Sequence, residues 1–324
     1  MENSTETGPT ALADGTAAST AWHAWHLHLG STARTVYDRV ITHVIGPAVA
    51  SVQGRPWFFI RYWQAGPHLR LRVGDLDEET LARVEELLRR RLETAGRLTR
   101  DERPVSQSSY ARIAEQLAAG EQEQDRFVQD LLIPGVHRAV YAPEFARYGG
   151  RELMPYTERL FQLSSELVLA LMQHVSRQGA RSALALRATV CAAAAIGDTT
   201  EQAHFYAHGF QAWRSWAAEY GQVSIEQLDQ LSRVSHGEGT AGGPASGKSI
   251  DPASHGPFGH WHSAIGDLCH ELRHRTSMHP GQVVFSHVHM LHNRLGLSLF
   301  DELRTYAWLT DAFPTGESSE QGRN

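Results

Sequence analysis

Two arginines, Arg70 and Arg72, are the residues of this sequence best suited to bind an anion. They lie two positions apart in the segment Gly-Pro-His-Leu-Arg-Leu-Arg, residues 66–72. In a β-strand this spacing places both guanidinium groups on one face, while Leu69 and Leu71 point to the core. Two fork-shaped donors that line a cleft would converge on an anion such as a dicarboxylate. Spacing alone favours a solvent-exposed face, because most arginines are exposed.

A second candidate group lies in residues 141–150, with the sequence Tyr-Ala-Pro-Glu-Phe-Ala-Arg-Tyr-Gly-Gly. Glu144 and Arg147 are spaced to form an ion pair, and the two glycines end the element sharply. An ordinary connection between a strand and a helix would have the same features. The segment is therefore a candidate site only if other functional residues lie beside it.

Histidines crowd one segment near the end of the chain. His287, His289 and His292 are followed directly by Asn293 and Arg294. A single histidine on a helix is usually a packed core residue, but several near arginines favour a functional site. A histidine with a pKa near its reference value can take up and return protons at neutral pH. The spacing leaves open which of the three would do so.

Two nucleotide-binding patterns occur in a stretch rich in Gly, Ser, Pro and Ala, residues 236–256. Residues 242–249 have the spacing of a phosphate-binding loop, and the glycines of residues 237–242 have that of a dinucleotide fingerprint. Both require a strand before the glycines and a helix N-terminus after them. A polar stretch precedes them here and Pro252 follows, so we expect a flexible loop without a nucleotide.

Residues 270–274, His-Glu-Leu-Arg-His, have the pattern of a zinc hydrolase. On a helix His270 and His274 share a face, Glu271 would be the general base, and His279 would be a third ligand. The chain has 19 histidines, so the pattern can arise by chance, and the segment also has the pattern of an amphipathic helix. We expect surface histidines without a metal and keep the HExxH zinc hydrolase as a minor alternative.

The composition indicates a folded protein without a global positive field. The chain has 324 residues, is 41% hydrophobic and has a formal net charge of -6, which disfavours direct binding of nucleic acid. Its two cysteines, Cys191 and Cys269, are too few for a disulfide framework. Neither a secretory signal nor a run of about 18 apolar residues is evident. We expect a cytoplasmic protein that does not bind membranes, with a disordered tail over residues 1–20.

Hydrophobic periodicity predicts an α+β part over residues 21–148 and a helical part over residues 149–324. The first part has the ferredoxin-like order β-α-β-β-α-β. Its expected strands are residues 22–29, 57–63, 68–73 and 136–141, and its expected helices are residues 32–45 and 77–94. Strands 57–63 and 68–73 are expected to pair as an antiparallel hairpin. The helices expected in the second part are residues 151–175, 181–196, 201–220, 225–234, 259–275 and 282–312. A flexible loop is expected over residues 236–256, and the two parts are expected to form one domain overall.

Four segments together resemble one known family. They are Trp-Phe-Phe-Ile-Arg-Tyr at residues 57–62, the arginine segment 68–72, the Pro-Glu-x-x-Arg-Tyr-Gly-Gly segment 143–150, and His-Met-Leu-His-Asn-Arg-Leu at residues 289–295. Their order and spacing are similar to those of the elimination domain of lantibiotic dehydratases, also called the thiopeptide-type bacteriocin biosynthesis domain. The resemblance extends over residues 21 to 312.

The resemblance implies a lyase that acts on a ribosomal precursor peptide. Members remove the Cα proton of a glutamylated Ser or Thr and expel glutamate, leaving dehydroalanine or dehydrobutyrine, without a cofactor or a metal. Full-length members also have a large N-terminal glutamylating domain, for which 324 residues are too few. The resemblance therefore implies that a separate, glutamyl-tRNA-dependent enzyme is the partner. The site residues that it implies are Arg70, Arg72, Glu144, Arg147 and His289, with His287 and His292 as alternatives for the histidine.

Two other functions remain open on the same scaffold. Relatives in thiopeptide pathways are pyridine synthases, which join two dehydroalanines by a formal cycloaddition and release the leader peptide. These relatives generally lack the set of arginines and glutamate, so the presence of the set favours elimination over cycloaddition. A partner that only binds the precursor peptide is the third interpretation, which an intact site disfavours.

Overall fold

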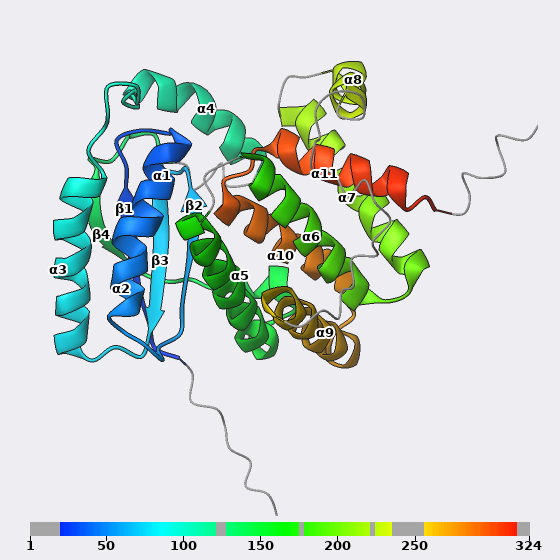
Figure 1. Cartoon of the computed structure of the whole chain (residues 1–324), viewed down its shortest axis with the longest axis horizontal. Coiled ribbons are helices and arrows are strands. Elements are labelled where there is room, and N and C mark those ends of the chain that lie inside the picture. Colours follow the sequence, from blue (N-terminus) through cyan, green and yellow to red (C-terminus); the bar gives the residue numbers. More distant parts are fainter. Residues whose placement is uncertain (1–19, 121–127, 175–177, 221–223, 235–255, 316–324) are drawn as a thin grey trace, which may run out of the picture.

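A four-stranded antiparallel sheet lies at one end of the molecule and a group of helices lies at the other (Figure 1). The computed structural model describes residues 20–120, 128–174, 178–220, 224–234 and 256–315. The expected tail over residues 1–20 and the expected loop over residues 236–256 lie almost entirely outside the described residues. Both nucleotide-binding patterns, within residues 237–249, also lie outside them.

The sheet has the strand order β2-β3-β1-β4, and every neighbouring pair is antiparallel. All four predicted strands are present, and the predicted pairing of residues 57–63 with residues 68–73 is confirmed. The strands are β1 (Trp22–His28), β2 (Trp57–Tyr62), β3 (His68–Gly74) and β4 (Gly135–Ala139).

The two faces of the sheet have opposite character. Leu69 and Leu71 of β3 are completely buried on one face, as the alternation predicts. On that face the indole N–H of Trp25 donates to Glu85 of α3 (Glu78–Ala95) at 3.3 Å. The other face holds Arg70 and Arg72, so the strand presents both guanidinium groups on the side away from α3.

The sequence predicts that the first helical segment ends at residue 45, but in the structure it continues beyond that residue. Helix α1 (Arg34–Val40) continues through a π-helical turn (Ile41–Ile45) into α2 (Gly46–Ala50). Pro47 stands in the first turn of α2, where a backbone N–H is not required. The wider turn before it accommodates the ring that would clash with a regular helical turn. Helix α4 (Gln107–Gly120), whose buried side chains among those described are Tyr110 and Ala114, was not predicted from the sequence.

The single helix that was expected over residues 282–312 is two helices. The first, α10 (Pro280–Leu295), ends at Gly296, whose left-handed conformation has a φ of 72°. Ser298 then opens α11 (Leu299–Ala312) with a capping box to Asp301. Both signals are present in the sequence, and a continuous apolar pattern obscured them. The other helices of this part are α5 (Met154–His174), α6 (Gln178–Ile196), α7 (Thr199–Tyr220), α8 (Ile225–Val234) and α9 (Pro257–Arg275).

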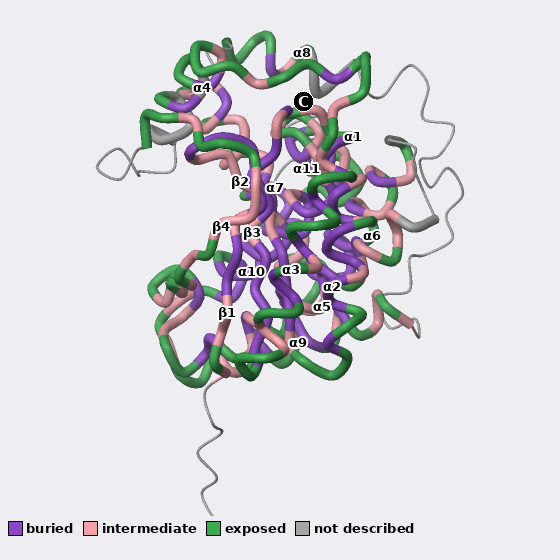
Figure 2. The backbone as a smooth tube through the Cα atoms, turned by 90° about the vertical axis from the view of Figure 1, so that its left-hand side faces the viewer, coloured by how far each residue is buried: buried purple, intermediate pink, exposed green. Residues whose placement is uncertain are grey.

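One continuous cluster of buried apolar side chains joins the sheet to the helices, and it runs through the middle of the molecule (Figure 2). Helices α5 and α10 pack directly against the edge strand β2. One window of α6, Gly179–Ile196, is long and apolar enough to cross a membrane, and half of it is buried in the protein. Its packing against α9 and α10 is that of a core helix.

Candidate active site

A cavity of about 610 Å³ lies between strands β2 and β3, the segment after β4, and helices α7, α10 and α11. The residues predicted for the site come from three separate parts of the chain, and all of them line this cavity. Five arginines line it against two glutamates, so its lining is positively charged. These predicted residues are Arg70, Arg72, Glu144, Arg147 and His289.

Arg72 is a buried cation at the wall of the cavity. Its side chain is almost enclosed, with 8% of the residue exposed, and it lies over the rings of Phe58 and Tyr141 at 5.6 and 5.4 Å. Its Nη1 donates to the backbone oxygen of Arg70 at 3.2 Å, while its buried Nε has no hydrogen-bond partner within the described chain. Burial, and then the charge of Arg70, lower the pKa of Arg72 to about 9. A bound anion would supply the missing partner and charge.

Arg70 lies beside Arg72 and contacts His68 and Tyr62. Its Nε donates to Nε2 of His68 at 3.2 Å, and its guanidinium carbon lies 3.3 Å from the centre of the Tyr62 ring. A guanidinium stacked on a ring directs its N–H groups outward from its edge, where a ligand can accept from them. The spacing rule that placed Arg70 and Arg72 on one face is thus confirmed.

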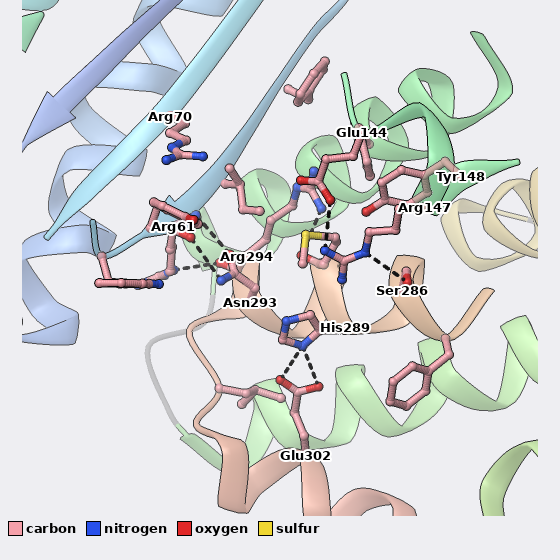
Figure 3. A pocket seen from close by; sticks show the side chains of 18 of the residues that line it. Arg61, Arg70, Glu144, Arg147, Tyr148, Ser286, His289, Asn293, Arg294 and Glu302 are labelled. Carbon is pink, nitrogen blue, oxygen red and sulfur yellow. Dashed lines mark hydrogen bonds and ion pairs between the residues drawn. The ribbon is translucent and has the colours of Figure 1, made fainter. Parts of the chain in front are cut away.

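Glu144 and Arg147 form the expected ion pair, with 3.1 Å between a carboxylate oxygen and Nη1 (Figure 3). Arg147 lies in a 3-10 turn (Phe145–Tyr148), and its Nε donates to the hydroxyl of Ser286 on α10 at 3.3 Å. Gly149 follows with a φ of 87°, and a Cβ there would lie 2.7 Å from Leu272. The turn therefore needs glycine at this position to bring Arg147 to the cavity.

His289 projects from α10 toward a buried carboxylate on α11. Its Nδ1 lies 3.0 and 3.1 Å from the two carboxylate oxygens of Glu302, and its ring lies 4.9 Å from that of Trp213. Figure 3 shows the opposite edge of the ring directed away from Glu302, toward the cavity. Burial opposes ionisation of Glu302, but His289 and His292 hold the pKa of its carboxyl below the usual range. Glu302 was not predicted from the sequence.

The other two candidate histidines occupy different environments. His287 is buried between the rings of Tyr148 and Phe161, at 5.1 and 5.4 Å, and burial lowers its pKa to about 3. His292 is completely enclosed and lies 3.0 Å from the hydroxyl of Thr189. Neither lines the cavity, whereas His289 does. The geometry thus distinguishes three histidines that the sequence could not.

A pair of reciprocal hydrogen bonds fixes the distance between the sheet and the histidine helix. The backbone N–H of Arg61 on β2 donates to the side-chain oxygen of Asn293 at 3.0 Å, and the amide of Asn293 donates back to the oxygen of Arg61 at 3.1 Å. The Arg61 guanidinium also donates to the oxygen of Arg294 and pairs with Asp38 of α1. A Cβ at Gly296 would lie 2.8 Å from that guanidinium, so a larger residue would displace it.

Arg294 is a further cation of the cavity that was not assigned to the site from the sequence. It is 1% exposed, donates to Ser165 at 3.0 Å and to the oxygen of Met290 at 2.9 Å, and burial lowers its pKa to about 9. Arg294 follows the histidine segment directly in the sequence, and this position was the signal that could have assigned it to the site.

Among the described residues, the HExxH segment and His279 do not gather three ligand atoms into one group, although the rings of His270 and His274 lie 4.2 Å apart. His270 and His274 are exposed on α9, and Glu271 forms an ion pair with Arg275 at 2.5 Å. His279 instead caps α10 by accepting the N–H of Gly281 at 3.1 Å. Among the described residues, the one group of three His, Cys, Asp or Glu side chains that could hold an ion lies elsewhere, on the sheet.

Comparison with known proteins identifies the class of this fold. The profile of the C-terminal domain of lantibiotic biosynthesis dehydratases matches residues 22–313, so the chain belongs to that family. No curated protein is detectably similar to it in sequence. Several solved structures have the same fold.

Three solved structures illustrate how the fold is used. The pyridine synthase TbtD from thiomuracin biosynthesis has a TM-score of 0.66 and 16% identity, over 90% of this chain and 98% of that one. The tRNA-dependent lantibiotic dehydratase MibB from Microbispora sp. 107891 has a TM-score of 0.51 and 18% identity, over 98% of this chain and 29% of MibB. TsrL has a TM-score of 0.51 and 14% identity, over 93% and 96%. At these identities the likeness establishes the fold.

Proposed function

We propose that the chain eliminates glutamate from glutamylated Ser or Thr residues of a ribosomal precursor peptide, leaving dehydroalanine or dehydrobutyrine. One observation supports this most strongly. The five residues that the family resemblance implies, Arg70, Arg72, Glu144, Arg147 and His289, line a single positively charged cavity.

In the proposed reaction His289 is the base. The carboxylate of Glu302 accepts the Nδ1 proton, which leaves the lone pair of Nε2 for the Cα proton of the substrate. As the Cα–H bond breaks, its electron pair is delocalised onto the peptide carbonyl as an enolate. The enolate then collapses to the Cα–Cβ double bond. The Cβ–O bond breaks, and its electron pair leaves with glutamate as a carboxylate. The proton stays on His289 until it is returned to solvent.

The arginines stabilise the negative charge that this step develops. Charge accumulates first on the peptide carbonyl oxygen and then on the departing carboxylate. Arg70 and Arg72 lie on one face and would bind one of these groups, while Arg147, paired with Glu144, lies on another wall and would bind the other. Such charge stabilisation is strongest where water is excluded, and Arg72 is the most buried of the three.

Cycloaddition to a pyridine ring is the second candidate. The coverage of 98% of TbtD favours it, because the two chains match over nearly the whole of that pyridine synthase. Cycloaddition requires neither a base held by a carboxylate nor a set of arginines for a departing carboxylate. The charge of the cavity therefore supports elimination over cycloaddition.

Elimination in this chain requires a peptide that is already glutamylated. We propose that a separate, glutamyl-tRNA-dependent enzyme supplies it in the cytoplasm. The likeness to MibB, a tRNA-dependent dehydratase of which the chain matches 29%, supports the dependence on glutamyl-tRNA.

The strand order β2-β3-β1-β4 supports a ferredoxin-like arrangement for residues 21–148, and the shared core supports one domain with the helical part.

The test uses a precursor peptide that carries glutamyl esters. Incubation with the protein should release one glutamate per ester and leave a dehydro residue, as measured by mass spectrometry. Esters that persist, together with cyclisation of a peptide that already contains dehydroalanines, would establish the pyridine synthase function instead.

A further inference from the structure

Three imidazoles gather on the face of the sheet that also holds Arg70 and Arg72, outside the cavity. His26 and His28 lie two residues apart on β1, and His68 of β3 stands directly opposite His28 in the ladder. Each offers a ring nitrogen, and these three atoms all lie within 4.8 Å of one another. We propose that His26, His28 and His68 bind one divalent transition metal ion, with zinc as the preferred occupant. This proposal does not depend on the proposed function.

The strand geometry explains why these positions converge. Residues i and i+2 of a strand project to one face, and a residue directly opposite on the next strand has its Cβ about 4.5–5.5 Å away. Three histidines in that arrangement present an open three-nitrogen site, a ligand set that binds zinc with a fourth position left for water or substrate. Nitrogens in a tetrahedral zinc site lie roughly 3.4 Å apart, so modest side-chain rotations would close the observed spacing.

The protonation of the three rings suits a metal. His68 donates from Nδ1 to the oxygen of Gly66 at 2.9 Å, which leaves the lone pair on its Nε2. The buried Nδ1 of His28 has no hydrogen-bond partner within the described chain, and His28 is only 2% exposed. Burial lowers the pKa of each of the three rings, which favours the neutral form that a metal ion needs.

Arg70 competes with the ion for one ligand. Its Nε donates to Nε2 of His68, and it also stacks on Tyr62 at 3.3 Å. When an ion takes the lone pair of His68, the guanidinium loses that bond and keeps the ring. His137 also faces the group, with its ring 5.1 Å from that of His28, but its Nε2 lies 3.1 Å from the oxygen of Ile133. Metal binding and the position of Arg70 are therefore linked.

The direct test is a titration of chelator-treated protein with Zn²⁺ by calorimetry, and with Co²⁺ by its visible absorption. We expect one equivalent of each ion per chain and a cobalt spectrum of a four-coordinate site. His26→Ala should weaken binding at least about tenfold, because one of three ligands is lost. His26 is the partly exposed member of the three, so this substitution is the least damaging to the fold.

Two further variants distinguish binding at the sheet from binding at the HExxH segment. His270→Ala, in that exposed segment, should leave the affinity unchanged. Arg70→Ala should raise the affinity several-fold, because it releases Nε2 of His68 and removes a positive charge. Melting temperatures of the metal-free variants show whether each is folded. The proposal would be overturned if wild type bound no stoichiometric ion. It would also be overturned if His270→Ala lost binding while His26→Ala kept it, or if Arg70→Ala had the same affinity as wild type.

Discussion

Nδ1 of His289 lies 3.0 Å from one carboxylate oxygen of Glu302 and 3.1 Å from the other. The two residues lie 13 positions apart and belong to different helices, α10 and α11. Glu302 is 2% exposed, so the pair is shielded from water on the side away from the cavity. A buried carboxylate that accepts the Nδ1 proton fixes the tautomer of the imidazole and stabilises its protonated form.

Replacing the carboxylate should therefore slow the reaction with little change in substrate binding. In Glu302→Gln, the side-chain amide can donate to Nδ1 and stabilise the wrong tautomer, with the lone pair turned away from the substrate. We expect kcat to fall about 10²–10⁴-fold with KM nearly unchanged. Steady-state kinetics on glutamylated peptide measure both. Asp311→Asn, at an exposed position of the same helix, is the matched control and should be fully active.

Arg72 should be irreplaceable by lysine. Arg72→Ala removes a contact that strengthens as charge develops, and we expect a loss on the order of 10²–10³ in rate. Arg72→Lys should not restore activity, because an ammonium group cannot make the fork-shaped contact. Arg83→Lys on α3, where the arginine side chain is 65% exposed, controls for the substitution itself. If the Arg72→Lys variant had a rate within a few-fold of wild type, Arg72 would act only as a point charge.

Substitution of one histidine of α10 should stop the reaction, and substitution of another should destabilise the fold. His289→Ala should stall the peptide with its glutamyl esters attached, in a protein that is still folded. His287→Ala should instead destabilise the fold by roughly 2–4 kcal/mol, because a buried ring between Tyr148 and Phe161 is lost. Denaturant unfolding and mass spectrometry separate the two effects. If the His287→Ala protein is folded but leaves every ester on the peptide, His287 and not His289 would be the base.

The sequence alone predicted much of the candidate site, the residues that line the cavity, because strand periodicity is strict. Arg70 and Arg72 were placed on one face by a two-residue repeat, and β2 and β3 pair as expected. The partner of His289 could not be predicted in this way. Glu302 belongs to a segment with the pattern of one long helix, and its approach depends on the turn at Gly296. A long-range contact set by the angle between two helices leaves no local pattern.

The same limit applies to the residues that hold β2 against α10. Arg61 and Asn293 are 232 positions apart, and their reciprocal hydrogen bonds depend on the complete tertiary fold. The histidine group on the sheet was not singled out from the sequence, although two of its members form the pattern His-x-His in β1. Its third member leaves no such pattern, because only the register of β1 against β3 places His68 opposite His28.

Acid stability should depend on one carboxylate near α1. Glu102 accepts from both Arg39 and Thr35 and from the N–H of Thr99, at 2.5–2.9 Å. Hydrogen bonds from Arg39, opposed by burial, lower the pKa of Glu102 from 4.5 to about 2. Since the folded-state pKa is the lower one, the stabilisation is complete above about pH 4.5 and is lost as the pH falls toward 2.

Glu102→Gln should therefore flatten the acid limb of the stability profile. Between pH 4.5 and pH 2 the free energy of unfolding of wild type should fall more steeply than that of the variant. Urea unfolding at several pH values measures this slope. Glu79→Gln, which removes an exposed carboxylate of α3, should leave it unchanged. Identical slopes for wild type and Glu102→Gln would show that the carboxylate is not stabilised in the folded state.

The most direct test of the proposed elimination is mass spectrometry of a precursor peptide with a defined number of glutamyl esters. Wild type should remove every ester, and each product should have lost glutamate and the Cα proton of the modified residue. His289→Ala and Arg72→Ala should accumulate the glutamylated peptide unchanged. Esters that survive wild type, with cyclisation of a peptide that already contains dehydroalanines, would contradict elimination and establish the cycloaddition.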